Sequence, residues 1–157
     1  MRAVLAWVAI GSVAGMLTGC GAAGRDDEPR GRSGQPQNTA EIVEQASDFG
    51  GIVIPDNASV LDARTEHGMD TLYRIALATD EAGVDRLLAA SRFAETPSKV
   101  FRVAESTIAG PPLDTSPSIL RTEDEYRGSG GATIYRIVIV DERGPQSRYV
   151  HIQLFDS

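Results

Sequence analysis

The chain of 157 residues contains a single cysteine, Cys20, and this count constrains its fold more than any other feature of the sequence. One cysteine forms no intramolecular disulfide and supplies no cysteine-based zinc site. The folded part must therefore be stabilised by a hydrophobic core alone. Hydrophobic residues make up 41% of the chain and charged residues 24%, as in ordinary globular domains, so the material for such a core is present.

An apolar segment precedes the cysteine. Arg2 is its only charged residue, and residues 3–17 carry no charge. An apolar stretch of about fifteen residues is short for a membrane span and suits the hydrophobic region of a secretory signal. We therefore expect residues 1–19 to be a signal peptide.

The segment ends in Leu17-Thr18-Gly19-Cys20, which resembles the lipobox of bacterial lipoprotein precursors. In that family the cysteine thiol receives a diacylglyceryl group, and cleavage leaves the cysteine as the first mature residue. The resemblance implies a protein whose lipidated, palmitate-bearing Cys20 anchors it to the extracytoplasmic face of the cell membrane. Two alternatives remain: an uncleaved membrane anchor, and ordinary signal cleavage that releases the protein.

Residues 20–37 contain glycine, proline and charged residues but no aliphatic side chain larger than alanine after the cysteine. Such a segment buries nothing, so we expect a disordered tether. The net charge is -7, and removal of Arg2 with the signal leaves -8. An acidic protein is repelled by nucleic-acid phosphates and by anionic lipid, so nucleic acid is not an expected partner. Membrane attachment is expected through the lipid instead.

The rest of the chain predicts a short helix or linker over 38–50 and a small α+β domain over 51–157. Asn38 and Glu41 have the spacing of a capping box, and Asp80 is a good N-cap for a second, amphipathic helix. The strands are expected at 59–65, 71–79, 99–104, 132–140 and 148–155. The prediction is an antiparallel sheet of about five strands with one main helix packed on a face. In layout this domain resembles small uncharacterised lipoproteins of GC-rich Gram-positive bacteria, a likeness that implies no activity.

Few residues are candidates for chemistry. No hydrolase motif is present in the sequence, and we expect no catalytic, cofactor-binding or metal-binding residue. His67 lies in an expected turn and His151 on the expected polar face of the last strand, and they would form an acid–base site only if they met carboxylates in a cleft. The three acidic residues 123–125 are expected in a solvated loop within a long irregular segment, 105–131.

Three functional hypotheses follow. The first is a non-catalytic binding or accessory module that engages an envelope protein or component through an exposed apolar or aromatic patch, expected near 105–131. The second is a small-ligand carrier or sensor, which requires an enclosed pocket. The third is an enzyme that uses a histidine–carboxylate cluster. We favour them in that order, and expect the protein not to be an enzyme.

Overall fold

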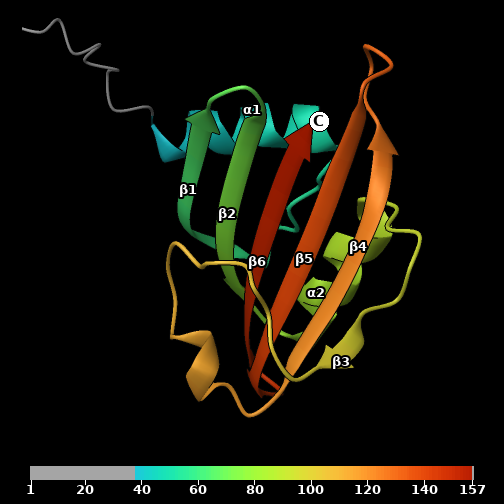
Figure 1. Ribbon diagram of the computed structural model, residues 1–157. Coiled ribbons are helices and arrows are strands. Elements are labelled where there is room, and N and C mark those ends of the chain that lie inside the picture. Colours follow the sequence, from blue (N-terminus) through green and yellow to red (C-terminus); the bar gives the residue numbers. More distant parts are fainter. Residues whose placement is uncertain (1–37, 157) are drawn as a thin grey trace, which may run out of the picture. The chain divides into compact units, whose positions relative to one another are not determined.

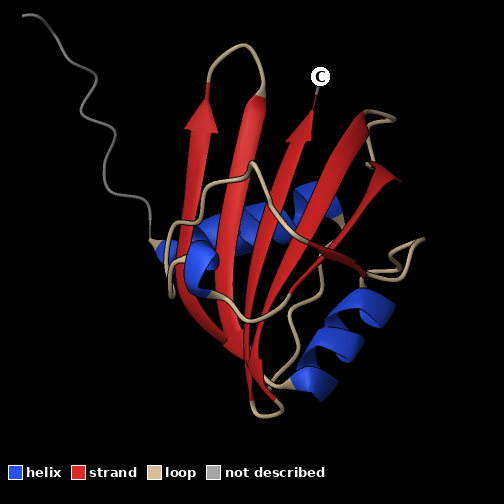
Figure 2. Ribbon diagram, turned by 60° about the horizontal axis from the view of Figure 1, so that its bottom comes forward, coloured by secondary structure: helices blue, strands red, loops and turns tan. Residues whose placement is uncertain are grey.

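The computed structural model describes residues 38–156, which form one antiparallel sheet with two helices packed on one of its faces (Figures 1 and 2). The strand order is β1-β2-β6-β5-β4-β3. The elements are α1 (Thr39–Gly50), β1 (Ser59–His67), β2 (Thr71–Thr79), α2 (Glu81–Ala90), β3 (Ser98–Val100), a 3-10 turn (Leu113–Thr115), β4 (Ile119–Arg127), β5 (Thr133–Gly144) and β6 (Ser147–Asp156). Within this part of the chain no helix is long and apolar enough to span a membrane. The expected signal peptide 1–19, Cys20 and the tether 20–37 lie outside the described residues.

The α+β class is confirmed, with six strands instead of about five and two helices instead of one main helix. The first helix, α1, packs on the sheet through Ile42 and Ala46, which are buried in the same core as α2. Asn38 caps this helix as expected, but it accepts from the amide of Ala40. Glu41 accepts from the side chain of Gln45, and no hydrogen bond from the amide of Asn38 to Glu41 completes the expected capping box.

The core lies between the helices and the face of the sheet that they cover, here called the helix face. Alternation along β2 and β6 directs Tyr73, Ile75 and Leu77 and their partners Leu154, Ile152 and Val150 to this face, as the sequence predicts. Helix α2 adds Val84 and Leu87, and the carboxylate of Asp80 caps it by accepting from the amide of Gly83 at 2.7 Å.

Two expectations about the middle of the chain are wrong. The expected strand 99–104 is reduced to β3, and Phe101 is 96% exposed. Within the expected irregular segment 105–131, β4 is a nine-residue strand paired along its length with β5. Its sequence, ILRTEDEYR, lacks the apolar alternation that predicts a strand. One face of β4 points to solvent, and the buried face contains the polar residues Thr122 and Asp124.

Asp124 is paired on the helix face with Arg136 of β5, whose side chain is only 2% exposed. The guanidinium donates to both carboxylate oxygens at 2.6–2.7 Å and, through Nη1, to the carbonyl oxygens of Gly50 and Ser91 at 3.1 and 2.9 Å. The ring of Phe93 lies 4.1 Å from its central carbon. The pair therefore links β4 and β5 to the C-terminal ends of both helices.

Replacement of this arginine, Arg136→Met, is expected to lower the free energy of unfolding by about 3–5 kcal/mol, because it leaves a buried carboxylate without a counter-ion. Urea denaturation followed by circular dichroism measures the loss. Arg64→Met is the control, since Arg64 is 59% exposed and pairs with Asp62 on the surface, and its expected cost is below about 1 kcal/mol. Equal costs for the two variants would contradict a central role for Arg136.

Candidate functional site

The opposite face of the sheet, here called the loop face, is crossed by residues 101–118, which we name the strap (Figure 1). Side chains of β4, β6 and β1 bind the strap to the sheet through hydrogen bonds. Arg121 of β4 donates to Glu105, Gln153 of β6 to the carbonyl of Ser106, and Arg64 of β1 to the carbonyl of Ile108. The strap thus passes over the sheet toward β1 and returns to enter β4.

The return path is fixed by Asp141 of β5, a carboxylate with no exposed surface. Arg143 donates to both of its oxygens from Nε at 2.8–2.9 Å, and Ser116 of the strap donates to it at 2.5 Å. Arg143 also donates to the carbonyls of Pro112 and Thr115. One arginine–carboxylate pair therefore holds the 3-10 turn of the strap against the sheet.

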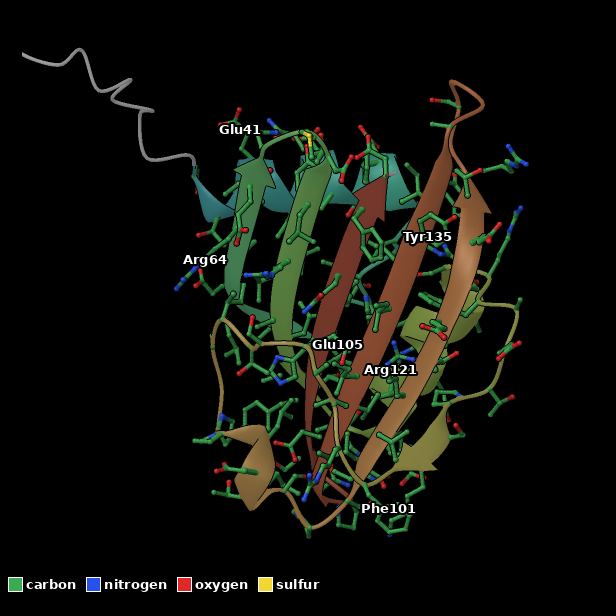
Figure 3. All side chains as sticks on the ribbon, viewed as in Figure 1. Glu41, Arg64, Phe101, Glu105, Arg121 and Tyr135 are labelled. Carbon is green, nitrogen blue, oxygen red and sulfur yellow. The ribbon has the colours of Figure 1, made fainter. Side chains whose placement is uncertain are left out.

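At the other end of the strap, Glu105 and Arg121 form a half-buried ion pair, 2.9 Å apart, visible at the centre of Figure 3. Burial alone would raise the pKa of the Glu105 carboxyl. The hydrogen bonds from Arg121 and from backbone amides, together with the charge of Arg121, outweigh burial and hold this pKa below its ordinary value. Glu105 is therefore ionised at neutral pH and fastens the strap to β4.

His151 of β6 lies beneath the strap and is 3% exposed, so the expectation that it points to solvent is wrong. Gly110 of the strap, with a φ of +91°, approaches so closely that a Cβ there would lie 3.6 Å from the imidazole. Neither ring nitrogen has a hydrogen-bond partner. Burial lowers the pKa of His151, and the negative charge of Asp141 only partly opposes this shift. The ring is therefore neutral at physiological pH.

The two histidines do not meet. His67 is exposed and pairs in register with Thr71, whereas His151 pairs with Ala76, so they lie five residues apart along β2 and on opposite faces. Ser116 and Asp141 are hydrogen-bonded, but no hydrogen bond joins either of them to His151. Across residues 38–156 no three His, Cys, Asp or Glu side chains are grouped so as to hold a metal ion. Glu123 and Glu125 are exposed as expected, but they lie on a strand.

The strap leaves the other half of the loop face uncovered, and we call this part the open half. At its centre the rings of Tyr135 (β5) and Phe155 (β6) stack with centroids 5.4 Å apart and planes 21° apart. Figure 3 shows Tyr135 on this part of the sheet, away from the strap. Two hollows flank Phe155: one of about 390 Å³ reaches β4, and one of about 540 Å³ reaches the β1–β2 turn. Leu72, Ile137 and Gln153 complete their floor.

Acidic side chains surround this aromatic floor. Glu123 and Glu125 border the hollow toward β4, and Glu66 and Asp70 border the hollow toward β1. Arg121 pairs with Glu123, and Arg74 pairs with Glu66, each at 2.8 Å. Among the described residues Glu125 and Asp70 take part in no ion pair, so the rim has an excess of negative charge.

The pairing of Tyr135 with Phe155 is not predicted by the sequence, because only the register of β5 on β6 places the two residues directly opposite each other. The one indication in the sequence is that Tyr135 precedes Ile137 by two residues and Phe155 follows Gln153 by two, so each aromatic residue shares a strand face with its neighbour. The exposed patch was expected near 105–131; the acidic side of the open half lies there on β4, and its aromatic centre lies outside that range. No family model, curated protein or solved structure matches the chain.

The buried histidine gives a pH-dependent prediction. Its pKa is lower in the folded than in the unfolded chain, where it is about 6.5. As the pH falls through about 6.5 the unfolded chain gains a proton that the folded chain resists, so His151 lowers stability in acid. His151→Leu is expected to reduce the loss of stability between about pH 7.5 and about pH 5.5, by at most about 1.4 kcal/mol per pH unit. Urea denaturation across this range tests it, with His67→Leu as the exposed control; an unchanged pH dependence in His151→Leu would contradict the assignment.

Proposed function

We propose that this protein is a lipid-anchored, non-catalytic binding module on the extracytoplasmic face of the cell membrane. The supporting observation is the open half, where a half-buried stacked aromatic pair lies on the part of the loop face that the strap does not cover. Stacked rings on a rigid sheet offer a large contact area at little cost in conformational entropy. The partner would be an envelope protein or component.

The arrangement of the described residues favours this function over the enzyme hypothesis. A general acid–base site needs a titratable group within reach of both a partner and a substrate. His151 is enclosed without a hydrogen-bond partner. His67 borders the hollow at the β1–β2 turn beside Glu66 and Asp70, but its ring is hydrogen-bonded to Thr65, and within residues 38–156 no hydrogen bond joins it to a carboxylate. The carboxylate that the strap covers, Asp141, is already bound by Arg143 and Ser116.

The alternative function is a small-ligand carrier or sensor. A carrier buries most of its ligand in an enclosed cavity. The two hollows of the open half lie side by side across the sheet and share Phe155, which suits a ligand laid over the surface better than one enclosed by it. We therefore rank the carrier second.

The anchor is tested by Cys20→Ala. This variant is expected to lose all incorporation of radiolabelled palmitate and to leave the membrane fraction, because Cys20 supplies the only thiol for lipidation. Immunoprecipitation after labelling and fractionation of the cells measure both effects. Palmitate incorporation that persists in the variant would contradict the lipoprotein assignment.

The binding surface is tested by a photo-crosslinking amino acid placed at Gln153 in the open half, in cells that express the full chain. A discrete cross-linked species is expected there because the residue borders the hollow beside Phe155. The matched control is the same amino acid at Glu44, an exposed position of α1 on the other side of the sheet. Cross-linked species that are absent at Gln153, or identical at both positions, would contradict the proposed surface.

A further inference from the structure

We infer that the open half binds a basic, extended segment of a partner protein, with an arginine or lysine side chain against an outer ring face of the Tyr135–Phe155 stack. This inference rests on the proposed binding function and specifies the chemistry of the partner. Its grounds are the charge of the rim, the electron-rich rings of the floor and the shape of the hollows.

The negative charge around the floor favours a cationic ligand. Four carboxylates border the hollows on the loop face, Glu66, Asp70, Glu123 and Glu125, and the imidazole of His67 also lines the hollow at the β1–β2 turn. The other two charged residues there, Asp124 and Arg136, are paired with each other on the opposite face. Arg127 extends the face beyond Glu125 and donates to the carbonyl of Gly131 at 3.3 Å. It keeps its positive charge, but it borders neither hollow and forms no ion pair within residues 38–156.

The two arginines nearest the rim leave part of this negative charge unbalanced. Arg74 pairs with Glu66, and Arg121 divides its guanidinium between Glu105 of the strap and Glu123. Glu123 is 60% exposed and is therefore accessible to a second cation. Glu125, two residues along the same strand and on the same face, has no counter-ion among the described residues.

The floor adds a second attraction for the same charge. The faces of aromatic rings are electron-rich and attract a guanidinium or ammonium group placed over them. In the Tyr135–Phe155 pair the two rings are nearly parallel, and both residues are half-buried. A cation beside the pair therefore meets π-electron density on one side and the carboxylates of Glu123 or Glu125 on the other.

The shape of the site indicates a polypeptide segment. The two hollows together extend from β4 to the β1–β2 turn, across five adjacent strands. Four inter-strand spacings of about 4.8 Å make this distance about 19 Å, which is the length of an extended peptide of about six residues. At the turn Met69 is fully exposed and provides an apolar contact at one end. A second copy of this acidic chain is a poorer occupant, because its net charge of -7 opposes self-association through an acidic face.

The test is a titration of the full-length protein, solubilised in detergent, with a short acetylated peptide in which arginine alternates with valine. Calorimetry is expected to detect binding that weakens as salt is added, while a peptide with glutamate in place of arginine does not bind. The double variant Glu123→Gln/Glu125→Gln is expected to weaken binding about five- to tenfold. Tyr135→Leu is expected to weaken it about two- to fivefold, because it removes one ring face.

The matched control is Glu44→Gln/Asp48→Asn, which removes the same charge from exposed positions of α1. Equal weakening of peptide binding in the control variant would show attraction to net charge alone and would overturn the inference. Binding of the glutamate peptide, or failure of the arginine peptide to bind, would overturn it as well. Sedimentation of the protein alone is measured in parallel, and self-association that the Glu123/Glu125 variant abolishes would assign the face to a second copy. If the cross-link at Gln153 persists while the arginine peptide fails to bind, the binding function stands and only the basic partner is wrong.

Discussion

The buried pair of Arg136 and Asp124 is the interaction on which the arrangement of the domain depends. A charge in the core is costly unless every donor and acceptor is matched. Here the guanidinium binds the carboxylate with two nitrogens and reaches the last carbonyls of both helices with the third. Phe93 and Tyr126 enclose it from the sides. The helices, otherwise held by non-directional apolar contacts, are thereby fixed at their C-terminal ends.

The same two strands serve both faces of the sheet. Alternation along β4 sends Thr122, Asp124 and Tyr126 to the helix face and Glu123 and Glu125 to the loop face. On β5, Arg136 points into the core while Tyr135 stacks with Phe155 on the other side. The residues that fix the core and those of the candidate binding surface are therefore neighbours in sequence, and the rigidity of the first set positions the second.

Much of the fold follows from periodicity alone. The bounds of β2, the cap at Asp80 and the inward faces of β2 and β6 were all predicted, because their apolar residues alternate or recur at helical spacing. Strand β4 is not predicted, because its buried positions are polar and their partners are distant in sequence. Arg136 pairs with Asp124, and the carbonyl of Glu95 accepts a hydrogen bond from Thr122. The burial of His151 was missed for the same reason: only the strap covers it, and its path is set by hydrogen bonds between residues far apart in sequence. The pairing of Tyr135 with Phe155 likewise requires the strand register.

The strap covers one half of the loop face and leaves the other accessible. Its attachments to the sheet stabilise this arrangement. It is bound at Glu105, Ser106, Ile108 and Ser116 to side chains of four strands, so its detachment requires several hydrogen bonds to break together. Arg121 links the two halves, because its Nε and Nη2 donate to Glu105 of the strap and the same Nη2 donates to Glu123 of the open half. Glu123, which is 60% exposed, therefore belongs both to the strap's network of ion pairs and to the rim of the open half.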